Sequence, residues 1–190
     1  MNLQDYILGI QLHLIKTHQK VLEMFDINSD VRNYRPKDQG WTISEILEHI
    51  ALTSHFLLIL IEKGTDKALK NVQDLSLTEE LEKEKFDLHK IDTIGIHKSF
   101  DWIRPEHMEP QGQKKDYEIK TELINQLHIC LNQLQKLKGG EGLLYKTTMT
   151  VNGLGKLNVY EYILFLSKHA ERHLYQIEEN IKEYSENNIL

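Results

Sequence analysis

The chain has 190 residues, a formal net charge of -6 and a single cysteine. This length is enough for one sizeable hydrophobic core. The acidic balance, without a basic stripe, argues against nucleic acid as the main partner. A lone cysteine excludes a disulfide within the chain and fits a reducing compartment, so we expect a cytoplasmic protein. The N-terminus lacks signal-peptide features, and the longest apolar run, residues 56–61, is too short to span a bilayer, so no membrane partner is expected.

The first two predicted helices are indicated by apolar periodicity and by a start signal. Between residues 3 and 25, most apolar residues recur every three or four positions, which predicts a helix. The second helix has a clear beginning. Thr42 and Glu45 have the spacing of a capping box, and Trp41 and Ile46 have that of the hydrophobic staple across it.

The second helix is expected to end at Gly64, because glycine commonly closes helices. Its apolar stripe carries His49 at one edge. Residues 64–118 then lack a sustained period and are rich in charge, although residues 76–89 have the capping pattern of a short helix. A connection of this length is either functional or mobile.

The third and fourth long helices lie in the C-terminal part of the chain. Residues 119–138 return to a helical period and are followed by two glycines that should stop the helix. Residues 143–157 contain β-branched positions and an Asn-Gly turn, which indicate either a small hairpin or extended chain. Asn158 and Glu161 are spaced to begin the last helix as a capping box.

Four long amphipathic segments and no convincing set of strands predict an all-α four-helix bundle. We expect residues 1–190 to form a single domain. Residues 64–118 are then an insertion between the second and third helices. This insertion has too few apolar residues for a core of its own, so we expect it to lie over one end of the bundle.

The last helix carries two histidines, His169 and His173, at a spacing that suits a metal ion. Residues four apart lie on one helix face, one turn apart. Two imidazole nitrogens can then reach one ion at about 2.0–2.1 Å. His49 is the best candidate for a third ligand. Three histidines leave a position open for water or substrate, as in catalytic sites. The alternative interpretation is that all three are polar residues at the boundary of an apolar stripe.

Familiar catalytic motifs are missing, because the sequence has neither His-Glu-x-x-His nor a Cys-x-x-Cys pair. Glu171 lies about 200° around the helix from His169 and should face away from a metal. Glu45, one turn before His49, is the only carboxylate we can place near the site. Cys130 is expected to be a small buried apolar residue. The other histidines are expected to have structural or surface roles: His13, His18, His55, His89, His97, His107 and His128.

Four segments in order resemble the DinB/YfiT-like superfamily: Arg35-Pro36, then residues 41–50, 155–161 and 169–177. The match spans nearly the whole chain. This resemblance implies a four-helix bundle of up-down-down-up order that is often a homodimer. It also implies a divalent metal ion held by three histidines, which correspond here to His49, His169 and His173. Zinc or nickel is expected first, with iron or manganese as alternatives.

Some members of the family that this chain resembles are thiol-dependent transferases or isomerases that use low-molecular-weight thiols such as bacillithiol or mycothiol. We therefore expect a metal-dependent S-transferase that acts on small electrophiles, because a metal favours the nucleophilic thiolate. One alternative is a metal-dependent hydrolase, which needs a base such as Glu45. Another is a non-catalytic bundle that binds a metal or a ligand. The expected partners are a small-molecule substrate, a thiol and a second copy of the chain.

Overall fold

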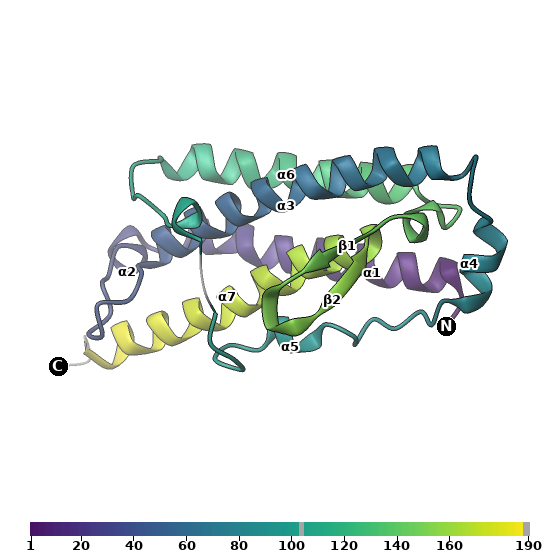
Figure 1. Ribbon diagram of the computed structural model, residues 1–190. Helices are drawn as coiled ribbons and strands as arrows, with labels where there is room; N and C mark the ends of the chain where they lie inside the picture. Colours follow the sequence, from purple (N-terminus) through teal and green to yellow (C-terminus); the bar gives the residue numbers. More distant parts are fainter. Residues whose placement is uncertain (103–104, 188–190) are drawn as a thin grey trace.

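The computed structural model describes residues 1–102 and 105–187. This part is mostly helical, with one small two-stranded sheet, so the prediction of an all-α protein is confirmed. Figure 1 shows four long helices side by side, in which α1 and α3 each contact both α6 and α7. Their bounds are α1 Leu3–Glu23, α3 Ile43–Asn71, α6 Asp116–Lys136 and α7 Val159–Asn187.

Short elements connect the long helices. The strands form an antiparallel hairpin, whose turn places Asn152 and Gly153 at φ values of +47° and +65°. Asparagine and glycine adopt this left-handed conformation more readily than other residues, which explains the Asn-Gly pair. The short elements are η1 Met24–Asp26, α2 Ser29–Arg32, α4 Leu77–Lys83, α5 Asp92–Gly95, η2 Glu106–Met108, η3 Glu141–Leu144, β1 Lys146–Met149, η4 Val151–Gly153 and β2 Gly155–Asn158.

Both helices that carry the candidate ligands begin at the predicted caps. At the start of α3, the Glu45 N–H donates to Thr42 Oγ1 at 3.2 Å, and the Thr42 N–H donates to Glu45 Oε2 at 2.8 Å. At the start of α7, the Glu161 N–H donates to Asn158 Oδ1 at 3.0 Å, and the Asn158 N–H donates to Glu161 Oε2 at 2.8 Å. These reciprocal bonds satisfy backbone donors that the first turn would otherwise leave unpaired.

The expected end of the second helix at Gly64 is wrong, because α3 continues to Asn71. Gly64 is buried where another part of the chain approaches closely. A Cβ atom at Gly64 would lie 3.2 Å from Val159 Cγ2 and 3.5 Å from Tyr145 Cδ1. The glycine therefore permits close packing in the middle of the helix, and the fully buried Ala68 continues the same face beyond it.

The insertion also differs from the prediction. Its first part, α4, lies at one end of the long helices beside η3, as predicted, but the chain then continues along the side of the bundle to α5, which packs on α7 (Figure 1). Ser76 caps α4 as expected, since its side chain accepts the Glu79 N–H. The short helix nevertheless ends at Lys83, well before the predicted end at His89.

The insertion is anchored mainly to α7. Ile91 and Ile94 are fully buried in the main hydrophobic cluster. The insertion, which has no core of its own, therefore packs into the core of the long helices. Charged side chains of α7 supply the other anchors, in the ion pairs Glu161–Lys90, Lys168–Asp92 and Glu179–Lys98. This anchoring brings the second half of the insertion close to the candidate site.

The central helix α3 is long and apolar enough to cross a membrane by length and composition alone. However, 61% of its most apolar window is buried against the rest of the protein. Burial of this kind is typical of a core helix.

Candidate metal centre

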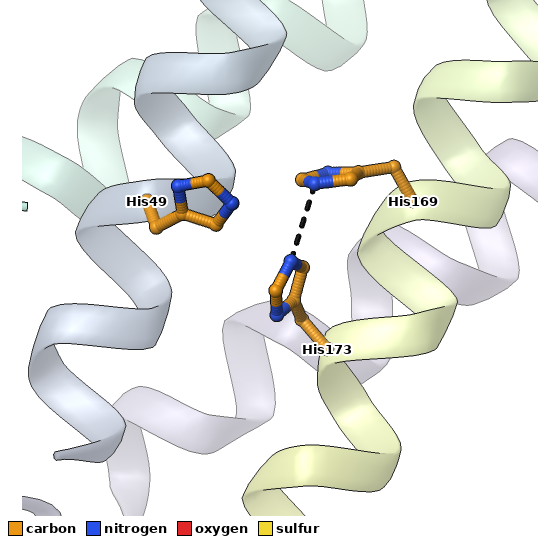
Figure 2. A group of neighbouring side chains, drawn as sticks. All are labelled: His49, His169 and His173. Atoms are coloured by element: carbon orange, nitrogen blue, oxygen red, sulfur yellow. Dashed lines mark hydrogen bonds between the residues drawn. The ribbon is translucent and has the colours of Figure 1, made fainter. Parts of the chain in front are cut away.

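The three predicted ligands converge. Figure 2 shows His49 on α3 pointing toward His169 and His173 on α7. The Nε2 atoms of His169 and His173 are 3.2 Å apart. One ring nitrogen from each histidine lies within 4.8 Å of the other two. All three side chains are buried, and among the described residues no cysteine or carboxylate joins the group.

The environment keeps the imidazoles of His169 and His173 neutral. Burial, reinforced by the neighbouring His173 and His49, lowers the pKa of His169 well below its usual value. Burial and the nearby His49 lower the pKa of His173 to about 3. A neutral ring has a lone pair on one nitrogen, which is the form that binds a metal ion.

Hydrogen bonds at the far side of two rings select the tautomer. His49 Nδ1 lies 2.7 Å from the carbonyl oxygen of Met108, and His173 Nδ1 lies 3.0 Å from Gln176 Oε1. Both partners are acceptors, so the proton is on Nδ1 in each ring. The lone pair is then on Nε2. Partners of this kind orient the ligands of metal sites and raise their basicity.

The donor set fits a divalent metal ion. In tetrahedral coordination at about 2.0–2.1 Å, two ligand nitrogens lie about 3.3–3.4 Å apart. The His169–His173 separation of 3.2 Å is close to that value. Imidazole nitrogen suits zinc, nickel, iron and copper. The three histidines could therefore hold one ion and leave a coordination position open.

The comparison with known families agrees with this arrangement. The family model of the DinB superfamily matches residues 13–177. The chain belongs to the DinB superfamily. No curated protein and no solved structure matches it significantly. The matched region of this DinB superfamily member contains all three histidines.

Two tryptophans form aromatic walls around the site of this DinB protein. The Trp41 ring lies 4.7 Å from the His49 ring between centroids, and the Trp102 ring lies 5.5 Å from the His169 ring. Trp102 belongs to the insertion, as does the carbonyl of Met108. No local pattern predicts the contact of Trp102 with His169 or that of Met108 with His49, because each joins segments that are far apart in the sequence.

Carboxylates near the site are engaged elsewhere. Glu45, the base considered from sequence, accepts two hydrogen bonds from Arg35, at 2.7 and 2.8 Å, and one from the Thr42 N–H. Burial raises the pKa of Glu45, but these bonds outweigh burial and leave the pKa below its usual value. The buried Glu48, which sequence reasoning missed, accepts the Gly112 N–H at 2.8 Å.

The remaining candidates lie outside the triad. Glu171 contacts Lys168 at 3.1 Å and His13 at 3.5 Å, as expected for a residue that faces away from the metal side of α7. Cys130 is fully buried in the main hydrophobic cluster, as expected, and burial raises its pKa to about 12. The seven other histidines do not belong to the cluster of three: His13, His18, His55, His89, His97, His107 and His128.

Proposed function

We propose that this DinB superfamily protein is a metal-dependent enzyme in which His49, His169 and His173 hold one divalent ion. The observation that carries the proposal is the convergence of three buried imidazoles from two helices, with hydrogen bonds at Nδ1 of His49 and His173 that place the lone pair on Nε2. When bound, the ion would lower the pKa of a thiol or water molecule at the open position. Zinc or nickel is the proposed metal.

The proposed reaction is the transfer of a low-molecular-weight thiol to a small electrophile. The thiol proton passes to solvent, and an electron pair of the sulfur forms the new bond to the electrophilic carbon. In a substitution the leaving group departs with its bonding pair; in an addition the π electron pair moves to the neighbouring atom, which takes up a proton from solvent. One observation favours a thiol over hydrolysis, and a second favours an external thiol over one supplied by the chain. Glu45 and Glu48 are committed to other donors, so neither is available as a base for water. Cys130 is buried and protonated, so the chain offers no nucleophilic thiol of its own.

The residues of the chain have distinct roles in this proposal. The three histidines would hold the ion, and Gln176 and the carbonyl of Met108 orient two of them. Trp41 and Trp102 exclude water from the ring cluster. A dry, apolar surrounding strengthens electrostatic interactions with a thiolate compared with water.

A non-catalytic role is the second candidate, and one observation favours it. The exposed fractions of His49, His169 and His173 are 4%, 2% and 9%, so little of the triad is open to solvent. An ion in this position would then serve to tie α3 to α7.

We extend the proposal to the architecture and the assembly. An up-down-down-up bundle is supported by Figure 1, in which α1 and α7 run one way and α3 and α6 run the other. Membership of the DinB superfamily supports the same order. A single domain over residues 1–190, a homodimer and a cytoplasmic location are proposed from the sequence and its resemblance.

The decisive test is the metal content of the purified protein beside that of His173→Ala. We expect about one equivalent in the wild type, as one three-histidine site requires, and its loss in the variant. His128→Ala is the matched control, because His128 is exposed on α6 and outside the cluster. Failure to bind zinc, nickel, iron or manganese after reconstitution would refute the site.

The two candidate functions are separated by the cobalt-loaded protein. An enzyme with an open position should show a change in the cobalt absorption spectrum when a small thiol is added, followed by thiol-dependent consumption of an electrophile. A spectrum that does not respond to any thiol in a panel, with no turnover, would favour the ion as a structural link between α3 and α7.

A further inference from the structure

Arg172 is a buried cation beside the candidate ligands. It precedes His173, but its side chain extends toward the insertion, where it meets Ile96, Ser99 and Phe100. Only 7% of the residue is exposed. Within the described part of the chain, no carboxylate forms an ion pair with it. Burial of an unpaired charge is unfavourable unless hydrogen bonds replace its hydration.

The insertion supplies those hydrogen bonds. Arg172 Nη1 donates to the carbonyl oxygen of Ile96 and, at 3.3 Å, to Ser99 Oγ. Arg172 Nη2 donates to the carbonyl oxygen of Phe100 at 3.4 Å. A planar guanidinium can serve several acceptors at once, which a lysine ammonium cannot do in the same geometry. The hydrogen bonds therefore tie residues 96–100 to the turn of α7 that carries the triad.

The guanidinium also packs against two aromatic rings. Its carbon atom lies 5.0 Å from the Phe100 ring centroid and 5.3 Å from that of Trp102. The Phe100 and Trp102 rings are stacked, with centroids 5.1 Å apart and planes at 27°. Trp102 in turn approaches His169 at 5.5 Å. Cation–π contact and stacking thus form a continuous path from Arg172 to a proposed metal ligand.

We propose that Arg172 is a positioning residue, which holds Trp102 of the insertion against His169 as a wall of the metal pocket. The inference rests on the proposed function, because the wall is assigned to the site where the ion and the thiol would meet. It adds that the pocket is completed by the insertion and is not built by the long helices alone. Loss of Arg172 should release Trp102 while leaving the three ligands in place.

The chain contains two tryptophans, so one substitution isolates the signal. In Trp41→Phe, all tryptophan emission comes from Trp102. We expect saturable quenching of this emission on titration with Ni²⁺, since nickel at the triad would lie close to the ring. The further change Arg172→Gln should shift the emission to longer wavelength and reduce the maximal quenching by at least half. The nickel affinity, taken from the midpoint, should change little.

A structural role alone would lower stability without moving Trp102. Lys98→Gln in the same background is the matched control, because Lys98 is an exposed cation of the insertion that pairs with Glu179. Lys98→Gln should leave both the emission wavelength of Trp102 and its maximal quenching by Ni²⁺ unchanged. If Arg172→Gln does not fold, Phe100→Leu takes its place, since it removes the ring that stacks on Trp102 and should shift both readouts in the same direction.

Acrylamide quenching of the metal-free protein separates this inference from the proposed function. Arg172→Gln should make Trp102 more accessible to acrylamide even if no metal binds. An unchanged emission wavelength and unchanged acrylamide quenching in a folded Arg172→Gln or Phe100→Leu variant would overturn the positioning role. Absence of nickel binding together with increased acrylamide quenching would refute the metal site and retain the role of Arg172.

Discussion

His49 Nδ1 lies 2.7 Å from the carbonyl oxygen of Met108, a residue 59 positions away in the insertion. This contact sets the tautomer of the one proposed ligand that α3 contributes. Its acceptor is a backbone atom and cannot be removed by substitution. The equivalent contact of His173 is accessible to mutation, because its acceptor is the side chain of Gln176.

Replacing Gln176 with leucine should weaken metal binding by about 10–100-fold, which is typical for loss of a hydrogen-bond partner behind a ligand. The Nδ1–H of His173 would lose its acceptor at 3.0 Å, and the ring would be less firmly oriented. Competition with a chelator measures the affinity. Glu178→Leu, an exposed change on the same helix, should have no effect. Equal affinities for Gln176→Leu and wild type would show that this bond does not prepare the site.

Glu45→Gln should affect stability and leave any catalytic activity intact. Glutamine can still complete the capping box, so the substitution removes mainly the ion pair with Arg35. We expect a loss of less than about 1 kcal/mol in the free energy of unfolding, as for other partly exposed ion pairs. Urea denaturation gives that value. A large fall in turnover at unchanged stability would instead identify Glu45 as a base and favour the hydrolase.

Gly142→Ala should destabilise the protein by about 1–3 kcal/mol, the usual effect of overpacking. A Cβ atom at Gly142 would lie 2.7 Å from Cε2 of the fully buried Tyr160. The hydroxyl group of Tyr160 donates to the carbonyl oxygen of Leu137, which hinders movement of the ring. Gly139→Ala is the control in urea denaturation, because its new methyl group would meet only the flexible end of Glu141. Equal losses for both variants would rule out the steric explanation.

Acid should destabilise the metal-free protein in part through His18. This side chain is 1% exposed, and burial lowers its pKa despite the opposing hydrogen bond to the Leu14 carbonyl. The unfolded chain therefore binds a proton more readily than the folded one. Stability is lost as the pH falls below about 6.5, the ordinary histidine value.

His18→Leu should reduce this loss, measured as the difference in unfolding free energy between about pH 7.5 and pH 5. It should not abolish the loss, since His169 and His173 act in the same direction. His128→Leu, at an exposed position, serves as the control. The explanation fails if His18→Leu loses as much stability as the wild type.

Sequence alone was sufficient for the features that depend on neighbours three or four residues apart. The caps at Thr42 and Asn158 and the shared face of His169 and His173 are of this kind, because helix geometry relates such positions directly. The sequence also offers His49 as the best candidate for the third ligand, but the full set of three is implied by the family resemblance, since no local rule joins different helices.

Only the tertiary structure revealed what surrounds the triad. Gly64 resembles a helix end in sequence, yet the approach of Val159 makes it a point of close packing. Trp102 and Arg172 have no motif in common, and their contact depends on the path of the insertion along α7. Such contacts arise where distant segments pack into one core and where backbone carbonyls of the insertion accept hydrogen bonds from the buried Arg172. Both depend on the folded chain as a whole.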